Sequence, residues 1–184
     1  PVALGVAKAL NAPLDMLFVR KIGAPAQPHL AAAAVVDGPE SVTVLNEIVM
    51  ESHGIDRDYI EREATRQLAE FARRRRRFFG ERPPTGVAGR TVLIVDDGIA
   101  TGTTARAALQ AARRQMPRRL ILAVPVASAE SLRVIGQDAD EIVTLLRPDW
   151  MGAVGQFYKE FHRLDDEEVV EILEQAPTTA GRRG

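Results

Sequence analysis

Two adjacent carboxylates, Asp96 and Asp97, stand between an apolar run and a glycine- and threonine-rich stretch in the segment TVLIVDDGIATGTTARAAL. Carboxylate oxygens accept hydrogen bonds from hydroxyl groups, or bind them through a cation. Gly98 and Gly102 let the backbone bend and approach a ligand closely, and the N–H groups of residues 101–104 would point outward from a helix N-terminus, where anions bind. A ligand with both hydroxyls and a phosphate, such as a sugar phosphate, satisfies both halves of the segment.

Three other kinds of site share parts of this pattern. A Walker A loop requires a lysine after its last glycine, whereas Thr103 follows Gly102 here. A dinucleotide-binding fingerprint requires G-x-G-x-x-G spacing, which is absent from this loop. A receiver domain requires a phosphoacceptor aspartate at the end of a later strand, and the run 141–146 ends without one. An ordinary acidic helix cap explains one carboxylate, but not two acids with two glycines and three threonines.

The elements that must position these residues follow from the apolar runs around them. Near-continuous apolar runs predict strands over 91–95, 119–126 and 141–146, and they alternate with predicted helices over 103–115 and 129–135. This alternation predicts an α/β fold with a doubly wound, mainly parallel sheet and helices on both faces. In such sheets ligands bind at the carboxyl ends of the strands, which is where the two aspartates stand.

The N-terminal part of the chain predicts a different set of elements. Helical spacing starts at Pro1, and a short buried strand is predicted over 14–19, with Arg20 and Lys21 at its C-terminal end. The stretch 22–32 lacks periodicity and is predicted to be a mobile loop. A hairpin signal joins the β-prone runs 33–36 and 42–45. A long amphipathic helix is predicted over 56–79.

The C-terminal part, RPDWMGAVGQFYKEFHRL, concentrates aromatic residues outside the alternating pattern. A short acidic helix is predicted over 165–175, and the tail TTAGRRG is expected to fray. The run Arg73 to Arg77 invites a nucleic-acid interpretation, but five successive arginines on a helix point all around its axis. A solvated helix end, where cations also favour the C-terminal end of the helix dipole, is the preferred interpretation of the run. Alternatively, some of the arginines lie along a subunit interface or meet acidic residues elsewhere in the chain.

Composition limits the classes of function. The 184 residues carry 24 basic and 25 acidic side chains, for a net charge of −1, so no overall attraction to nucleic acid or membranes is expected. There are no cysteines and three scattered histidines, which argues against thiolate or histidine-rich metal sites. No apolar run approaches the roughly 20 residues of a membrane span. We expect one soluble, cytoplasmic domain over 1–184.

The motif VLIVDDGIATGTT resembles the phosphoribosyl pyrophosphate signature of the type I phosphoribosyltransferases, and the resemblance spans most of the chain. It implies that Asp96 and Asp97 hold the ribose hydroxyls. It also implies that the 5-phosphate is bound by the loop of Ala100, Thr101, Gly102, Thr103 and Thr104. The implied reaction displaces pyrophosphate from the anomeric carbon by an acceptor, usually a base nitrogen, with Mg²⁺ carried on the substrate rather than held directly by the protein.

The same resemblance assigns further residues. Arg20 and Lys21 resemble the family's pyrophosphate contact, which makes Lys21 a catalytic candidate beside the two aspartates. The residues at about 22–46 resemble the flexible lid, and those at about 147–175 resemble the C-terminal hood, where Trp150, with Phe157 and Tyr158 behind it, would stack on the acceptor. A homodimer is expected because dimers are common in the family.

Two departures from the family pattern narrow these expectations. The family's first strand and its other pyrophosphate loop precede the first helix, so they are expected before Pro1 and missing from this chain. Purine-salvage members carry an aspartate at the position of Ala100, which counts against a hypoxanthine-guanine enzyme and leaves the acceptor unidentified. The alternative function is a non-catalytic regulator of the same fold that senses phosphoribosyl pyrophosphate or a nucleotide.

Overall fold

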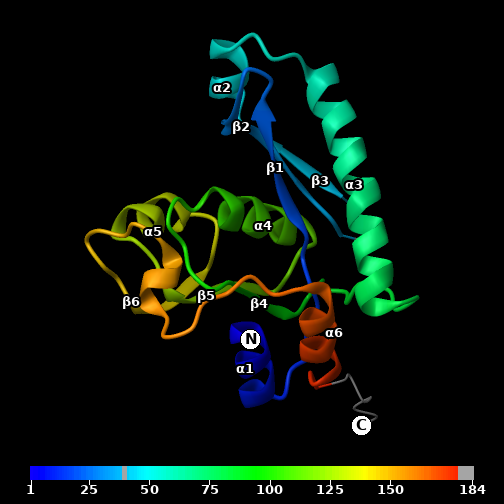
Figure 1. Ribbon diagram of the computed structural model, residues 1–184, viewed down its shortest axis with the longest axis vertical. Helices are drawn as coiled ribbons and strands as arrows, with labels where there is room; N and C mark the ends of the chain where they lie inside the picture. The colour runs from blue at the N-terminus through cyan, green and yellow to red at the C-terminus, as the bar shows by residue number, and fades with distance from the viewer. Residues whose placement is uncertain (39–40, 178–184) are drawn as a thin grey trace.

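A computed structural model describes residues 1–38 and 41–177 and contains two separate three-stranded sheets. The first is antiparallel, in the order β1-β2-β3, and the second is parallel, in the order β4-β5-β6. Figure 1 shows the antiparallel sheet and the long helix α3 standing above the parallel sheet and its helices. The predicted α/β architecture, with a parallel sheet flanked by helices and an additional hairpin, is confirmed.

The parallel sheet has the boundaries predicted from the apolar runs. It consists of β4 (Thr91–Val95), β5 (Arg119–Val126) and β6 (Glu141–Leu146), connected by α4 (Thr103–Arg114) and α5 (Ala129–Ile135). Alternate residues of β5, from Leu120 to Val126, are buried and share a core with α4 and α5. Figure 1 shows α4 above β4 and β5, and α1 (Val2–Leu10) below them.

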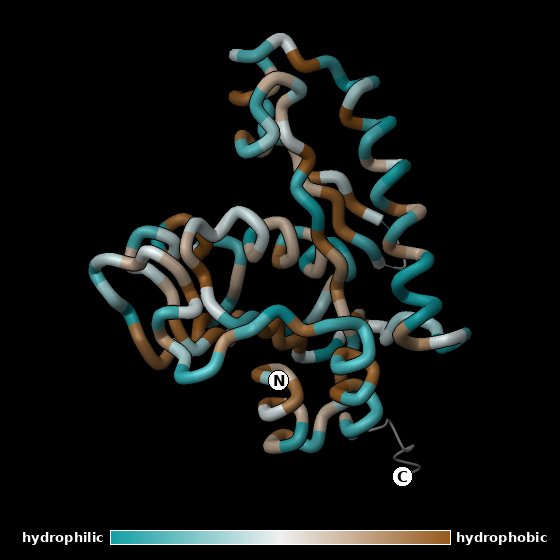
Figure 2. Tube along the Cα trace, in the orientation of Figure 1, coloured by the Kyte–Doolittle hydropathy of each residue, from teal (hydrophilic) through white to brown (hydrophobic). Residues whose placement is uncertain are grey.

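The antiparallel sheet is formed by β1 (Val19–Ala24), β2 (Gln27–Val36) and β3 (Val42–Leu45). The long helix α3 (Arg57–Phe79) begins at Asp56, whose side chain accepts a hydrogen bond from the Tyr59 N–H. Its buried residues pack on this sheet, while Figure 2 shows the helix to be largely hydrophilic along its length. The short helix α2 (Glu47–Ser52), capped by Asn46, was not predicted.

Helix α4 packs between the two sheets and contributes to a separate core cluster on each side. Leu109 and Ala112 face the parallel sheet, whereas Ala107 and Ala111 pack against the antiparallel sheet. The six small or apolar buried residues of α4 therefore lie on two sides of the helix. Since α4 starts at the predicted phosphate loop, both sheets position that loop.

The predicted mobile loop over 22–32 is wrong. Most of this stretch belongs to β1 and β2, which pair up to Ala24 and Gln27 and so leave Pro25 and Ala26 as a two-residue turn. The register of β1 against β2 shifts on both sides of Gly23. The two strands approach so closely there that a side chain at Gly23 would lie 2.3 Å from the carbonyl oxygen of Pro28. Buried Ile22 and Ala24 hold the hairpin against the core.

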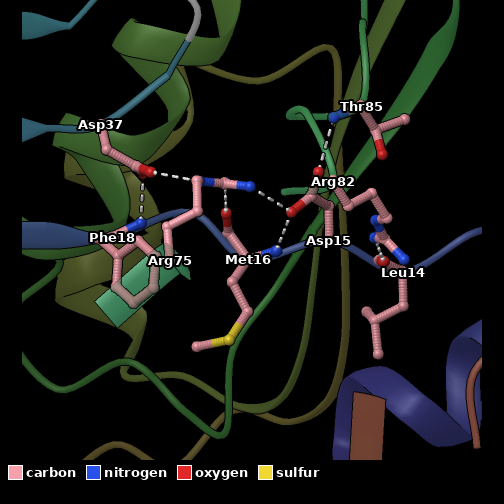
Figure 3. Close-up of polar contacts among 8 residues, drawn as sticks. All are labelled: Leu14, Asp15, Met16, Phe18, Asp37, Arg75, Arg82 and Thr85. Carbon is pink, nitrogen blue, oxygen red and sulfur yellow. Dashed lines mark hydrogen bonds and ion pairs between the residues drawn. The ribbon is translucent and has the colours of Figure 1, made fainter. Parts of the chain in front are cut away.

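The predicted strand over 14–19 is also wrong, because residues 12–18 form no strand and β1 begins at Val19. Side chains satisfy the backbone of this segment instead of a neighbouring strand, as Figure 3 shows. The Asp15 carboxylate accepts hydrogen bonds from the N–H groups of Met16 and Thr85, and Asp37 accepts one from the Phe18 N–H. As a result, Arg20 and Lys21 lie within β1 rather than at the end of a strand.

Arg75 of α3 is the centre of this network (Figure 3). Its guanidinium group donates to the carboxylates of Asp15 and Asp37, each at 3.1 Å, and to the Met16 carbonyl at 2.7 Å. Burial raises the pKa of Asp37 despite the hydrogen bonds from Phe18 and Arg75. Burial would also raise the pKa of Asp15, but the N–H groups of Thr85 and Met16 and the charge of Arg75 outweigh it and lower that pKa.

The arginine run of α3 is neutralised within the described chain. Each of the five arginines lies within 4.0 Å of at least one carboxylate: Arg73 pairs with Glu70, Arg74 with Asp166, Arg75 with Asp15 and Asp37, Arg76 with Glu81, and Arg77 with Asp166 and Glu167. The alternative in which the arginines meet acidic residues therefore applies to the whole run, and the preferred solvated helix end is wrong for Arg75, whose side chain is only 16% exposed. Two of these arginines connect α3 to α6 (Asp166–Glu174).

The C-terminal region returns across the molecule through the short 3-10 helix η1 (Val154–Phe157) to α6. A capping box between Asp165 and Glu168 starts α6, close to the predicted boundary. The tail predicted to fray, 178–184, lies outside the described residues. Over the part of the chain that the structure describes, no helix combines the length and apolar character that crossing a membrane requires.

Candidate active site

The two aspartates occupy the position that the sequence predicts, immediately after β4 at the carboxyl edge of the parallel sheet. Both side chains are solvent-exposed, and the Asp97 N–H donates a hydrogen bond to the Asp96 carboxylate at 2.9 Å. Among the described residues, neither carboxylate pairs with a basic side chain. Their charges are thus available to a ligand.

The surroundings of the pair disfavour ionisation. Although Asp96 reaches solvent, burial among the surrounding protein atoms raises its pKa from the usual 3.8 to about 6, and repulsion from Asp97 adds to the effect. Burial likewise raises the pKa of Asp97, against the opposing hydrogen bond from the Gly98 N–H. A ligand that donates hydrogen bonds or brings positive charge would make ionisation of the two carboxyl groups more favourable.

The loop after the aspartates has the geometry of an anion site. Gly102 begins α4 with φ of 77°, and a side chain there would lie 2.8 Å from Cδ1 of Ile135. Thr101, Thr103 and Thr104 are exposed at the helix N-terminus. Within the described residues, no N–H group from Ala100 to Thr104 donates a hydrogen bond to the protein. Unpaired N–H groups at a helix N-terminus favour a bound phosphate.

Two serines that the sequence analysis missed hold this loop from behind. Ser128, the N-cap of α5, donates its hydroxyl to the Ala100 carbonyl at 3.1 Å, and Ser131 donates to the Ile99 carbonyl at 3.3 Å. The Ile99 N–H in turn donates to Val126 at 2.9 Å. These contacts turn the loop carbonyls toward α5. A serine before a predicted helix signals a cap, but no sequence pattern connects it to a loop 28 residues earlier.

The C-terminal segment reaches the acid pair through Tyr158 rather than through Trp150. The Tyr158 hydroxyl donates to the Asp97 carbonyl, and its ring packs on Phe161 with the ring centroids 5.2 Å apart. Trp150 is 76% exposed, and no other aromatic ring of the described chain stacks on it. The predicted stacking of Trp150 on an acceptor therefore stays a prediction.

Arg20 and Lys21 are both exposed, but they face opposite sides of the antiparallel sheet, because neighbouring strand residues alternate in direction. Lys21 pairs with Ala34, which packs on α4, whereas Arg20 pairs with Val35, which belongs to the core under α3. Lys21 is consequently on the side of the helix that starts at the phosphate loop. No ion pair holds either side chain within the described residues.

A groove runs along the free edge of β4. This strand pairs with β5 on one side, and among the described residues no strand pairs with its other edge. Two cavities, of about 290 Å³ and about 410 Å³, lie between β4 and the segment 14–17. Pro1, Asp96 and Thr104 all line the larger one. The N-terminus of α1 therefore opens onto the same space as the acid pair.

Comparisons with known proteins agree with this geometry. Residues 1–162 match the model of the phosphoribosyl transferase domain. Two proteins of Mycobacterium tuberculosis, from strains CDC 1551 / Oshkosh and H37Rv, carry the provisional name phosphoribosyl transferase. Each is 44% identical to the chain over 176 residues, which is 96% of the chain but only 39% of the relative's length. The crystal structure of TT1426 from Thermus thermophilus superposes with a TM-score of 0.78 at 41% identity, covering 94% of this chain and 81% of that one.

Proposed function

Because the chain belongs to the phosphoribosyl transferase domain family, we propose that it transfers the 5-phosphoribosyl group of phosphoribosyl pyrophosphate to an acceptor. The observation that carries this proposal is the juxtaposition of two unpaired carboxylates with a loop of unpaired N–H groups at the start of α4. Hydroxyls of the ribose would donate to Asp96 and Asp97, and the 5-phosphate would accept from residues 100–104. The similarity of this fold to that of TT1426 supports a binding site at the carboxyl edge of the parallel sheet, where the acid pair and the loop lie.

In the proposed reaction, a nitrogen of the acceptor forms a bond to the anomeric carbon while the bond to pyrophosphate breaks. Pyrophosphate leaves with the electron pair, and the acceptor loses a proton to water. Positive charge that develops on the ribosyl centre would be stabilised by the nearby carboxylates, Asp96 and Asp97. Lys21 would neutralise negative charge on the departing pyrophosphate, and Arg20 is the second candidate for that contact.

Mg²⁺ fits this chemistry. Mg²⁺ prefers hard oxygen ligands and commonly binds one or two carboxylates together with substrate phosphates. The described residues contain no group of three or more acidic or histidine side chains that could hold a metal, so the ion is proposed to be carried on the phosphates of the substrate rather than held directly by the protein. When bound on the substrate, the ion would neutralise charge on the pyrophosphate. The protein residues would orient the ribose and the 5-phosphate.

The groove along β4 supports a further part of the proposal. One additional strand would satisfy the free edge of β4 and fill the two cavities, and a loop following it would enter beside Pro1 and Asp96. This is the place where the resemblance implies the second pyrophosphate loop. The acceptor is proposed to be a nitrogenous base other than hypoxanthine or guanine, since Ala100 brings no carboxylate to the loop.

A turnover screen tests the proposed activity. The full-length protein, with Mg²⁺ and phosphoribosyl pyrophosphate, is incubated with a panel of purine and pyrimidine bases, and pyrophosphate release is followed. The proposal predicts release that depends on one class of acceptor and is lost in the Asp96→Asn/Asp97→Asn variant. Tight binding of phosphoribosyl pyrophosphate without turnover for every base would contradict the transferase proposal and favour the regulatory alternative.

A further inference from the structure

Tyr158 connects the C-terminal segment to the acid pair across 61 residues of sequence. Its hydroxyl donates a hydrogen bond to the backbone carbonyl of Asp97 at 2.5 Å. The residue follows η1 directly and adopts an extended backbone conformation. A bond between a tyrosine hydroxyl and a main-chain carbonyl fixes a peptide group rather than a side chain.

The packing around this bond holds the two segments close together. A side chain at Gly98 would lie 2.7 Å from Cγ1 of Val154 and 2.9 Å from Cγ1 of Val126. A side chain at Gly155 would lie 2.8 Å from Cδ1 of Phe161, whose ring packs on Tyr158. Glycine at both positions therefore lets η1 and its aromatic neighbours rest on the turn after the acid pair.

The peptide group that Tyr158 holds also controls the Asp97 carboxylate. The carbonyl of Asp97 and the N–H of Gly98 belong to the same planar peptide unit, which begins at the Cα that carries the Asp97 side chain. A hydrogen bond to the carbonyl oxygen therefore fixes the orientation of this plane at that Cα. The Tyr158 hydroxyl thus acts on the carboxylate through one peptide group.

The negative charges of both aspartates affect the pKa of Tyr158. Burial raises the pKa of its hydroxyl, and the charges of Asp97 and Asp96 raise it further. The hydroxyl therefore stays protonated, and able to donate, throughout the pH range in which the aspartates titrate.

We propose that Tyr158 is a positioning residue for Asp97, which couples the seating of the C-terminal segment to the geometry of the acid pair. The inference rests on the proposed function, because the acid pair is taken to bind the ribose hydroxyls of phosphoribosyl pyrophosphate. Tyr158 does not need to touch the ligand. Its effect reaches the ligand through the orientation of the Asp97 carboxylate.

The test uses Tyr158→Phe, which removes the hydroxyl and retains the ring that packs on Phe161. Tyr59→Phe is a matched control, since the Tyr59 hydroxyl also donates to a main-chain carbonyl, that of Gly23, at 2.9 Å. Both variants lose one neutral hydrogen bond. A purely structural role predicts similar, small losses of thermal stability in the two variants and no difference between them at the acid pair.

Two measurements distinguish a positioning role of Tyr158 from a purely structural role. The carboxyl ¹³C chemical shift of Asp97 in the free protein, compared at one pH, should differ from that of the unmodified protein in Tyr158→Phe and be unchanged in Tyr59→Phe. Calorimetry with phosphoribosyl pyrophosphate and Mg²⁺ should show affinity weakened by about 2- to 10-fold in Tyr158→Phe only, the range for one net hydrogen bond.

An unchanged carboxyl shift of Asp97 together with unchanged affinity in Tyr158→Phe would overturn the inference. If the unmodified protein fails to bind phosphoribosyl pyrophosphate, the proposed function fails. The carboxyl NMR comparison then decides the positioning role by itself: a changed Asp97 shift in Tyr158→Phe supports it and an unchanged shift refutes it.

Discussion

At the scale of single residues, the acid pair combines two properties that are costly in a free protein. Asp96 and Asp97 carry like charges on adjacent residues, and burial raises the pKa of both. A fold that did not use these carboxylates would gain by losing them. The unfavourable ionisation of the two carboxyl groups in the free protein is consistent with a ligand that stabilises their charges when it binds.

The raised pKa gives the first prediction. Carboxyl ¹³C NMR of the free protein should show one aspartate with a titration midpoint near 6, because burial raises the pKa of Asp96 to about 6. That resonance should be absent in Asp96→Asn. Its midpoint should fall in Asp97→Asn, which removes a neighbouring negative charge. Midpoints below about 5 for every aspartate would contradict the electrostatic account of the site.

The same shift predicts how stability depends on pH. A carboxyl whose pKa is higher in the folded than in the unfolded protein destabilises the fold when ionised, and the penalty disappears as the pH falls through the folded pKa. At about pH 7.5, Asp96→Asn should therefore unfold at a higher temperature than the unmodified protein. The difference should shrink on lowering the pH to about 5. A variant that is less stable at the higher pH would show that Asp96 supports the fold.

At the scale of elements, the start of α4 depends on a residue without a side chain. Gly102→Ala places a Cβ at φ of 77° and 2.8 Å from Ile135. We expect a loss of about 1–3 kcal/mol in the free energy of unfolding by urea, the cost of one strained residue. Gly86→Ala is the control: Gly86 is exposed, has no atom within 4 Å of an added Cβ, and should change stability by less than about 0.5 kcal/mol.

The contact between α3 and the segment before β1 depends on Arg75. Arg75→Met removes the cation that neutralises Asp15 and Asp37, whose side chains are 21% and 10% exposed. Breaking such a pair leaves uncompensated charge, so we expect a loss of about 3 kcal/mol at neutral pH. Arg73→Met, which removes only an exposed pair with Glu70, should cost less than about 1 kcal/mol.

The pH dependence of the Arg75 variant checks this mechanism. Without the guanidinium group the pKa of both carboxyls should rise, so they protonate more readily as the pH falls. The difference in stability between Arg75→Met and the unmodified protein should then narrow from about pH 7 to about pH 5. An equal difference at both pH values would assign the loss to packing against Phe79 and Phe18 instead.

The elements show what the sequence could and could not predict. The parallel sheet was predicted to the residue because its strands are near-continuous apolar runs, as is typical of parallel strands, and end at predicted turns and helices. The segment 14–18 was misassigned because its backbone is satisfied by the side chains of Asp37, Arg75 and Arg82, which lie far along the chain. The motif identified the acid pair and the loop, whereas Ser128, Ser131 and Tyr158 act through long-range contacts that one sequence does not reveal.

At the scale of the whole molecule, both outer strands of the parallel sheet, β4 and β6, have an unpaired edge among the described residues. Native-state hydrogen exchange should find the amides of β5 the slowest of the parallel sheet, since β5 has a strand on each side and, among the described residues, β4 and β6 have one each. Exchange of β4 should be faster than that of β5. Equal protection of β4 would mean that another segment covers its groove.

The chain spans 39% of the length of the curated relatives that it matches, so activity, substrates and partners of the whole protein are proposals. The expected homodimer and the cytoplasmic location stay predictions. The charges of the arginine run are paired with carboxylates on α3, α6 and the neighbouring loops.

The central claim is that the acid pair and the loop at the start of α4 together bind phosphoribosyl pyrophosphate. The most direct test is a calorimetric titration of Mg²⁺ and phosphoribosyl pyrophosphate into the unmodified full-length protein and into Asp96→Asn/Asp97→Asn. Losing two charge-assisted contacts, each worth about 1.5–3 kcal/mol, predicts affinity at least about 100-fold weaker in the variant. Equal affinity in the two proteins would contradict the account.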